Sequence, residues 1–395
     1  MKRAPGMLTL LVLALFVLQA TTGCGGPAEP PAPPAADAGD SEPAPPAAPE
    51  AVSLAVGEPV EASPPMAEIN ADGKLVWRPD LWKSPPRGLP PVPDPAYNGI
   101  SVEKVELGRL LYFDKRLSKD GTVSCASCHH PATGFSNAQR FAAGIGGQLG
   151  GRNSPTVYNA AYQNETFWDG RAKSLEEQAM GPIENPIEMG QPLHEMIATV
   201  NAIPDYKPLF VKAFDNRKIN ENWVVQAIAA FERTILTGDA PFDRFRAGDN
   251  NALSEGAQRG LAVFEGKGRC LLCHMAPLFT DNVFHNLGVA SEGDKADAGR
   301  MDVTKNEKDW GKFKTPTLRN VSVTGPYMHD GSETTLESIV ELYDKGGVAN
   351  KNLDPLMQPL GLTPEEKADL VTFMKEGLTR EIEILIPPSA EAASN

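Results

Sequence analysis

From residue 100 onward, apolar side chains recur at the three- and four-residue spacing that is typical of amphipathic helices. The clearest apolar faces fall at residues 105–111, 223–231 and 261–264, between loops rich in glycine, proline and asparagine. No run of alternating apolar and polar residues is long enough to predict a sheet. The pattern therefore predicts a mainly α fold.

Two later helices carry start signals. Thr334 is followed three residues on by Glu337, and Thr363 by Glu366, which is the spacing of a capping box. Pro364 stands at the first helical position of the second of these helices. We therefore expect helices to begin just after Thr334 and Thr363.

The N-terminus has the pattern of a secretory signal. Lys2 and Arg3 precede an apolar run at residues 7–18 that is too short to span a bilayer, and small residues follow it. Cys24 then stands where a bacterial lipoprotein would be acylated, with ordinary signal cleavage nearby as the alternative. We expect residues 1–24 to be a signal peptide, and the mature protein to lie in the periplasm, tethered to a membrane surface through Cys24.

Residues 25–98 differ in composition from the rest of the chain. They hold 19 of the 36 prolines, and their 4 Lys/Arg and 11 Asp/Glu account for half of the chain's net charge of −14. A segment with so little apolar surface cannot offset the entropy of ordering, so we expect a disordered tether. Within it, the apolar residues that follow Lys74 are the part expected to dock on the folded chain.

The charge of the whole chain excludes one broad class of partner. Its 395 residues include 37 Lys/Arg against 51 Asp/Glu, a balance that disfavours binding to nucleic acid through neutralisation of phosphates. The hydrophobic fraction of 41% is ordinary for a chain that buries a core. The function must therefore be read from local motifs.

The motif C-x-x-C-H occurs twice, as Cys125, Cys128 and His129 and again as Cys270, Cys273 and His274. It is the attachment signature of c-type heme, in which two thiols reach the vinyl groups and the histidine binds the iron. A zinc site would need further paired ligands nearby, and a redox cysteine pair would not need a histidine after it. The pattern predicts two covalent hemes in two similar domains, residues 99–246 and 247–395.

Four longer runs surround these motifs, and they read LGRLLYFDKRLSKDGTVSCASCHH, GGRNSPTVYNAAYQNETFWDGRAKSLEEQAMGPIENPIEM, GKGRCLLCH and FKTPTLRNVSVTGPYMHDGSETTLESIVELYDKGG. In collinear order over residues 100–380, they resemble the bacterial diheme cytochrome c peroxidase superfamily, which includes the methylamine-utilisation (MauG-type) diheme enzymes. The resemblance implies two c-type cytochrome domains in tandem, the first meeting peroxide and the second relaying electrons. It also implies reduction of hydrogen peroxide, through a high-valent iron state, with electrons from a small c-type cytochrome or cupredoxin.

The resemblance assigns three catalytic residues. Glu188 matches the acid–base glutamate over the first heme, Gln178 matches its pocket partner, and Trp168 matches an indole that lies between the two hemes. A positioned carboxylate can move the proton that cleavage of an O–O bond requires. We therefore expect these three residues to carry the reaction.

Two further features follow from the same resemblance. A calcium site between the domains is implied at Asn153, Thr324 and Pro326, largely through carbonyl oxygens, which suit a hard cation. His285 and His329 fall in family-like stretches near the second heme. We expect these histidines to have a structural role or to contact a propionate.

Two positions depart from the typical peroxidase. Ile145 stands where a histidine would block the first iron in the oxidised enzyme, so we expect that iron to be open without prior reduction. Tyr343 stands where a methionine would bind the second iron, and a phenolate there would stabilise ferric and ferryl iron over ferrous iron. Met328 and Met357 are the alternative ligands.

The helical pattern supports Tyr343 as an inward-facing residue. Tyr343 follows Leu336, Ile339 and Val340 at the i, i+3, i+4, i+7 spacing that places side chains on one face of a helix. A plain core tyrosine would show the same spacing.

Two alternatives to a peroxidase stay open at this point. In the first, the oxidised hemes act on a side chain of a partner protein, as in the methylamine-utilisation enzymes, and Ile145 and Tyr343 favour this variant. The second belongs to a different class, a non-catalytic diheme electron-transfer cytochrome. That protein would hold two six-coordinate irons and would have no use for Glu188.

Overall fold

The computed structural model describes residues 68–215, 218–290 and 296–387, which all belong to one compact unit, Glu61–Asn395. The expected signal peptide, Cys24 and the tether up to residue 67 lie outside the described residues. Within those ranges the chain is mainly helical, which confirms the predicted class. None of the helices there has the length and apolar character needed to cross a bilayer.

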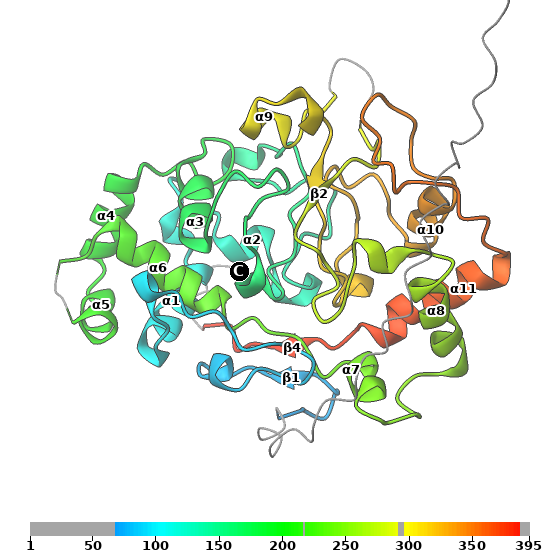
Figure 1. Ribbon diagram of the computed structural model, residues 1–395. Coiled ribbons are helices and arrows are strands. Elements are labelled where there is room, and N and C mark those ends of the chain that lie inside the picture. The colour runs from blue at the N-terminus through cyan, green and yellow to red at the C-terminus, as the bar shows by residue number, and fades with distance from the viewer. Residues whose placement is uncertain (1–67, 216–217, 291–295, 388–395) are drawn as a thin grey trace, which may run out of the picture. The chain divides into compact units, whose positions relative to one another are not determined.

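Helices make up most of the regular structure, and the strands are short (Figure 1). The helices are α1 (Val102–Phe113), α2 (Cys125–Cys128), α3 (Leu175–Glu184), α4 (Leu193–Ala202), α5 (Tyr206–Phe214), α6 (Glu221–Glu232), α7 (Pro241–Arg246), α8 (Glu255–Glu265), α9 (Met301–Thr304), α10 (Leu336–Asp344) and α11 (Pro364–Thr372). The strands are β1 (Leu75–Val76), β2 (Phe284–His285), β3 (Phe313–Lys314) and β4 (Ile382–Glu383). β1 pairs with β4 in parallel, and β2 pairs with β3 in antiparallel orientation.

The predicted apolar faces and start signals can be compared with these helices. The faces at residues 105–111, 223–231 and 261–264 lie in α1, α6 and α8 and supply buried side chains to each, which confirms them. The capping box at Thr363 is also confirmed. The start predicted at Thr334 is wrong by one residue, because Thr335 caps α10.

Two pairs of helices cross at very short range, and a glycine permits each crossing (Figure 1). α1 packs on α6 at Gly108, where a Cβ atom would lie 1.8 Å from the carbonyl oxygen of Ala227. α8 packs on α11 at Gly260, where a Cβ atom would lie 1.9 Å from the carbonyl oxygen of Asp369. α1 leads to the first C-x-x-C-H motif and α8 to the second, so the same crossing precedes each motif.

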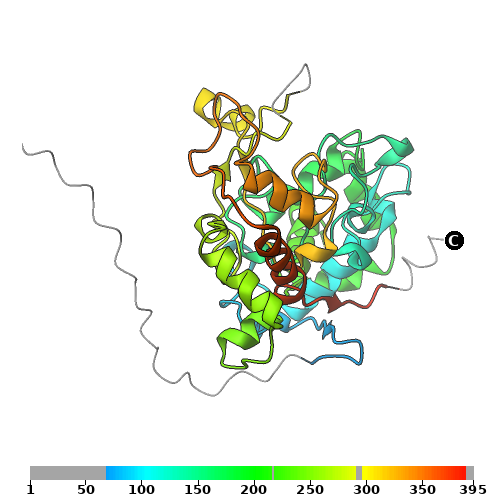
Figure 2. The ribbon, with the colours of Figure 1, turned by 90° about the vertical axis from the view of Figure 1, so that its right-hand side faces the viewer.

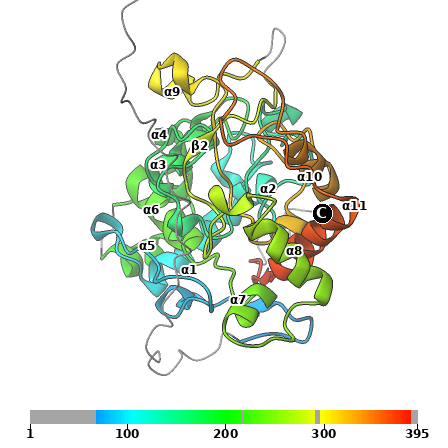
Figure 3. The ribbon, with the colours of Figure 1, turned by 45° about the vertical axis from the view of Figure 1, so that its right-hand side comes forward.

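The buried apolar residues form two hydrophobic clusters, one around each crossing. In the first cluster, Tyr112 of α1 meets Phe231 of α6 edge to face, with ring centroids 5.1 Å apart. In the second, Phe264 of α8 meets Phe373, directly after α11, at 5.4 Å. Figure 2 shows α10 beside α11, and Figure 3 shows α8 next to them. Each cluster therefore has its own aromatic centre.

A second repeated contact follows each motif. Asn159 and Asn320 both adopt the left-handed backbone conformation, with φ of 59° in each, which asparagine tolerates better than most residues. The side-chain oxygen of Asn159 accepts a hydrogen bond from the N–H of Thr237 at 2.9 Å. The side-chain oxygen of Asn320 accepts one from the N–H of Arg380 at 2.6 Å. Asn159 thus links the loop after the first motif to the chain after α6. Asn320 links the loop after the second motif to the chain after α11.

The segment 75–98 packs on the helices, so the prediction of a disordered tether is wrong for these residues. Leu75 is fully buried in the first cluster, and the indole N–H of Trp77 donates to Thr234 Oγ1 at 2.9 Å. β1, in this segment, pairs with β4 near the other end of the described chain. The apolar residues that follow Lys74 do dock as expected. The average composition of residues 25–98 does not show them, because the rest of that segment is rich in proline.

Candidate active site

A cavity of about 210 Å³ lies beside the second C-x-x-C-H motif. Cys270, Cys273 and His274 line it, together with apolar side chains from α8, α10 and α11. This volume is more than ten times what a single buried water needs. The size and the apolar lining suit a large planar group such as a porphyrin, placed against the two thiols that would attach it.

His274 has the surroundings of a metal ligand. Its Nδ1 lies 2.9 Å from the carbonyl oxygen of Phe279, to which a neutral ring donates a hydrogen bond. Burial is the main cause that lowers the pKa of His274, so the imidazole is held neutral. Nε2 is then the nitrogen with a free lone pair, which is what an iron ligand requires.

The residues predicted as the opposite iron ligand all border this cavity, namely Tyr343, Met328 and Met357. The other members of the predicted α10 face line the cavity as well. Burial, followed by the charges of the motif thiols, raises the pKa of Tyr343 well above its usual range. The hydroxyl therefore keeps its proton unless a metal cation takes the proton's place.

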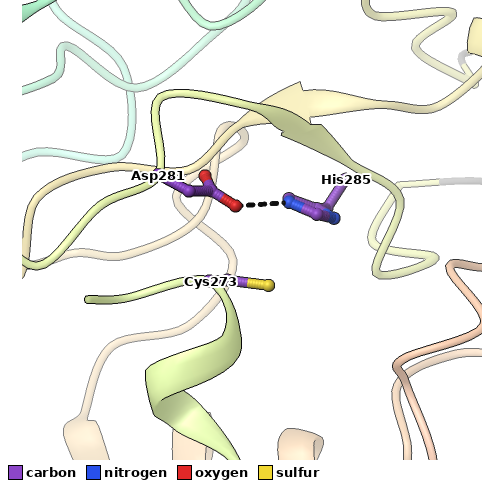
Figure 4. Close-up of side chains that lie close together, drawn as sticks. All are labelled: Cys273, Asp281 and His285. Carbon is purple, nitrogen blue, oxygen red and sulfur yellow. Dashed lines mark hydrogen bonds and ion pairs between the residues drawn. The ribbon is translucent and has the colours of Figure 1, made fainter. Parts of the chain in front are cut away.

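A polar cluster around His285 lies at the same cavity (Figure 4). Its Nε2 is 2.9 Å from a carboxylate oxygen of Asp281, and its Nδ1 is 2.6 Å from one of Asp354. Ligand atoms of Cys273, Asp281 and His285 lie within 4.8 Å of one another, close enough to hold a metal ion. A thioether at Cys273 would remove the thiolate that such an ion needs, so covalent heme and this metal site exclude each other.

The first motif begins on α2, which Ser124 caps. His129 follows α2, and its carbonyl oxygen accepts a hydrogen bond from the hydroxyl of Tyr112 at 2.9 Å. Burial lowers the pKa of His129, against the carbonyl groups of Phe135 and Pro155. Among the described residues, its Nδ1 is buried without a hydrogen-bond partner. A neutral imidazole directly after the two cysteines suits a ligand of heme iron, because its Nε2 can offer a free lone pair.

Glu188 lies in the loop after α3, close to the first motif. Asn185 donates a hydrogen bond from Nδ2 to Glu188 Oε1 at 2.7 Å. Burial raises the pKa of Glu188, while that hydrogen bond and the charge of Arg171 act in the opposite direction. Burial and then the charge of Glu188 raise the pKa of the Cys128 thiol to about 11. A half-buried acid of raised pKa beside an attachment site is a candidate for proton transfer.

The loop that carries Ile145 packs against the segment that carries Glu188. The N–H of Ile145 donates to the carbonyl oxygen of Glu188 at 2.8 Å. At Gly144 a Cβ atom would lie 2.0 Å from the carbonyl oxygen of Ile187, and the Ile145 side chain covers Gly190. Gly144 and Gly190 therefore allow the two loops to approach closely. The residue that this approach places beside the Glu188 segment is Ile145, whose side chain cannot bind iron.

Gln178 lies on α3 and is half-buried. The hydrogen bonds of the described residues include none between its side chain and Glu188. The Glu188 loop folds back on the same helix, because the N–H of Met189 donates to the carbonyl oxygen of Pro182 at 3.1 Å. The structure thus places the predicted pair in one region without joining the two side chains.

Trp168 lines the cavity of the second motif. Its indole N–H donates to the carbonyl oxygen of Asn153 at 2.8 Å, and the N–H of Asn153 donates to the carbonyl oxygen of His329 at 2.7 Å. The ring of His329 meets the ring of Trp168 edge to face, with centroids 6.5 Å apart. These contacts join the chain that follows the first motif to the chain that follows the second.

The three residues expected to bind calcium, Asn153, Thr324 and Pro326, line this same cavity. The amide nitrogen of the Asn153 side chain donates to the carbonyl oxygens of Gln139 and Arg140, each at 3.3 Å. This orientation leaves the side-chain oxygen of Asn153 as the atom available to a cation.

Lys314 is a buried cation in the cavity that sequence reasoning missed. Its Nζ donates to the carbonyl oxygen of Glu165 at 2.8 Å, and burial lowers its pKa to about 7. Lys314 stands inside the run FKTPTLRN, where its residue type and spacing give no sign that it is buried.

Glu232 is a second buried charged residue that was missed, and here the sequence held a signal. It follows Val225 by seven residues and Ile228 by four, so it falls on the buried face of α6. Burial raises its pKa to about 8. A carboxyl group on an apolar helix face is unusual enough to single out.

The fold and these sites together define a class of protein. It is a helical protein with two heme-attachment motifs, and a large apolar cavity lies beside the second. Burial lowers the pKa of both motif histidines, which favours the neutral imidazole that binds heme iron. Two such motifs in one helical chain are typical of a diheme c-type protein.

Comparison with known proteins identifies the family. Residues 102–251 match the family model described as di-haem cytochrome c peroxidase. The chain is 40% identical over 297 residues to methylamine utilization protein MauG of Methylorubrum extorquens, covering 75% of this chain and 84% of that protein. It is also 40% identical over 324 residues to cytochrome-c peroxidase IdrP1 of Denitromonas iodatirespirans, covering 74% and 86%. The protein therefore belongs to the diheme cytochrome c peroxidase family, a family of peroxidase-type oxidoreductases.

A solved structure shows the same relationship in three dimensions. The crystal structure of a MauG-like protein associated with microbial copper homeostasis superposes with a TM-score of 0.71 at 33% identity. The match covers 77% of this chain and 97% of that one. The likeness therefore extends over both motifs and the chain between them.

Proposed function

We propose that this protein is a diheme c-type peroxidase that reduces hydrogen peroxide to water in the periplasm. Its two c-type cytochrome domains, residues 99–246 and 247–395, stand in tandem. One heme is attached through Cys125, Cys128 and His129, and the other through Cys270, Cys273 and His274. The repeated glycine crossing and the repeated asparagine contact support this arrangement, since each occurs once with each motif.

The observation that carries the proposal is the half-buried Glu188 carboxyl, held by Asn185 at 2.7 Å in a loop that hydrogen-bonds to Lys119, just before the first motif, through Met189. The hemes supply iron that binds peroxide and transfers electrons. Glu188 accepts a proton from one peroxide oxygen and returns it to the other, so that the departing oxygen leaves as water. Asn185 holds one carboxylate oxygen and leaves the other for this transfer. Gln178 is the proposed second polar group of this pocket.

Electrons reach the first domain through the second. Two electrons and two protons convert one peroxide into two waters, and a small c-type cytochrome or cupredoxin supplies the electrons. Trp168 is the proposed relay, and Tyr343 and His274 are the residues that would hold the second heme iron. Calcium at Asn153, Thr324 and Pro326 would steady the contact between the domains. Acylation at Cys24 would hold the enzyme to a membrane surface.

Replacing Glu188 tests the proposal. In Glu188→Gln the turnover of peroxide should fall about 10²- to 10⁴-fold, with both hemes still attached. Glu184→Gln, at the exposed end of α3, is the matched control and should keep full turnover. Unchanged turnover in Glu188→Gln would remove this acid from the mechanism. Low-temperature EPR of the oxidised protein tests the other class, because absence of any high-spin ferric signal would identify an electron-transfer cytochrome.

A second candidate function is oxidation of a side chain on a partner protein. Ile145 and Tyr343 favour it, as do the 40% identity to MauG and the 33% identity to the MauG-like structure. Peroxide added without any donor separates the two functions. A protein that keeps both oxidising equivalents for minutes supports this candidate, whereas one that loses them within seconds supports a simple peroxidase.

A further inference from the structure

We propose that Glu232 is a redox-linked proton site of the first heme, binding a proton when that iron is reduced and releasing it when the iron is oxidised. This inference rests on the proposed attachment of heme at the first motif. It assigns a role to a buried acid that the peroxide chemistry of Glu188 does not use.

The first argument is the isolation of the Glu232 carboxyl. The residue ends α6 and is only 6% exposed, and its Oε2 is buried without a hydrogen-bond partner among the described residues. The adjacent cation, Arg233, makes hydrogen bonds of 2.8 and 3.1 Å to both carboxylate oxygens of Glu176. Because that cation is already engaged, an ionised Glu232 would have no dedicated counter-charge.

The second argument comes from the repeated helix crossing. Phe231 borders the glycine crossing of α1 and α6, and Phe373 borders that of α8 and α11. The next residues in the chain are Glu232 and Met374. Met374 lines the cavity beside the second motif. Glu232 therefore occupies, beside the first motif, the position of a residue that borders the space for heme.

The third argument is the set of groups that respond to the Glu232 charge. After the effect of burial, this charge is the largest cause that raises the pKa of the Cys125 thiol, and it also raises the pKa of the Tyr112 hydroxyl. That hydroxyl donates to the carbonyl oxygen of His129. The charge of the carboxyl thus acts on one attachment sulfur and on the tyrosine that hydrogen-bonds to the backbone of the proposed iron ligand.

The groups around Glu232 set the direction of its own proton affinity. Burial raises its pKa to about 8, Arg233 acts against this shift, and Glu176 adds to it. Tyr112 on α1 and Cys125 on α2 are the titratable groups that face it from the elements packed nearby. Neither Tyr112 nor Cys125 is a cation, and Arg233 is already paired with Glu176, so an electron added nearby raises the proton affinity further.

The coupled step balances in charge. Reduction moves one electron from the donor protein to the first iron, and one proton from water converts the Glu232 carboxylate to a carboxylic acid. Oxidation returns both. An ionised carboxylate at this place favours oxidised iron, whereas a protonated one leaves the potential higher. Reduction of the first iron should therefore become harder as pH rises.

The test measures the reduction potential of the first heme against pH, from about pH 5 to about pH 9, in the holoprotein and in two variants. Glu232→Gln keeps the shape of the side chain. Glu232→Met introduces the residue type of Met374, which is the counterpart of Glu232 near the second motif. The potentials of both variants should match the wild type near pH 5 and lie increasingly above it as pH rises. Glu221→Gln, exposed at the start of α6, is the control and should follow the wild type throughout.

The outcomes separate this inference from the proposed function. Curves that stay parallel between wild type and both variants overturn the role of Glu232, even where peroxide turnover is normal. A protein that carries no heme at the first motif overturns the proposed function itself. If the variants fail to fold, infrared difference spectra between reduced and oxidised wild-type protein still test the inference. Oxidation should then remove the carbonyl stretch of a protonated carboxylic acid, and its persistence would overturn the inference.

Discussion

The indole N–H of Trp168 donates a 2.8 Å hydrogen bond to the carbonyl oxygen of Asn153, whose own N–H binds the carbonyl oxygen of His329. A backbone carbonyl accepts a hydrogen bond but is too weak a base to take the proton. An indole held in this way can lose an electron and keep its proton, since no carboxylate is bound to its nitrogen. The hydrogen bond therefore suits Trp168 to electron relay and fixes its ring at the cavity wall.

Replacing this indole with Phe should separate relay from packing. Trp168→Phe keeps an aromatic ring but removes the N–H and the easily oxidised π system, so peroxide turnover should fall roughly tenfold or more. The free energy of unfolding should fall by about 1 kcal/mol, because the Asn153 carbonyl loses its partner. Trp223→Phe, which removes from α6 an indole that stacks on Phe214 of α5, is the control for turnover. Equal turnover in wild type and Trp168→Phe would rule out the relay.

The pH profile of turnover should report the surroundings of Glu188. A general base works when ionised, so turnover should rise with pH through the pKa of this acid. Because burial raises that pKa, the rise should occur at a higher pH than for an ordinary glutamate. In Asn185→Ala the carboxylate loses a hydrogen bond that stabilises its ionised form, so the rise should move up by about one pH unit. A rise that stays in place or moves down would contradict this assignment, and Asn201→Ala on α4 is the control.

Local periodicity is the part of the fold that could be predicted from the sequence. The apolar faces of α1, α6 and α8 are visible because helix geometry repeats every 3.6 residues whatever the tertiary contacts are. The docking of residues 75–98 could be predicted only in part, because it depends on Thr234 and β4, far away in the chain. The crossings at Gly108 and Gly260 could not be predicted, since a glycine in a helix gives no sign of what packs on it.

The candidate site divides in the same way. The two motifs are readable because heme attachment requires fixed residue types at fixed spacing, and the matched runs locate Glu188 and Tyr343. Lys314 and Glu232 were not predicted from the sequence, because what distinguishes them is their burial and not their residue type. Of these, only Glu232 interrupts an apolar helix face, so only it could have been found by pattern alone.

The two glycine crossings should be equally intolerant of a methyl group. In Gly108→Ala and Gly260→Ala the added Cβ would overlap a backbone carbonyl oxygen that cannot rotate away. Each variant should lose about 2 kcal/mol or more of the free energy of unfolding in urea titration of the holoprotein. Gly151→Ala has open space around its Cβ and should lose much less. Wild-type stability in either crossing variant would show that the helices separate at little cost.

Glu232 should make the stability of the folded protein depend on pH in a predictable direction. Its pKa is about 8 in the fold and about 4.5 in an unfolded chain, so the folded state holds an extra proton between those values. Stability should therefore fall as pH rises from about 4.5 to about 8, by an amount on the order of a few kcal/mol, and then level off. Glu232→Gln cannot ionise, so its advantage over the wild type should grow across this window.

Lys314 is the matched comparison for Glu232, because its burial should make stability change with pH in the opposite direction. Burial lowers its pKa from 10.5 to about 7, so the unfolded chain holds the extra proton between these values and wild-type stability should rise with pH there. Urea titrations at several pH values should thus show the advantage of Glu232→Gln over the wild type growing up to about pH 8, and that of Lys314→Met shrinking as pH rises above about 7. If both variants kept a constant offset from the wild type, neither side chain would change its protonation on folding, and both would be as exposed as ordinary surface residues.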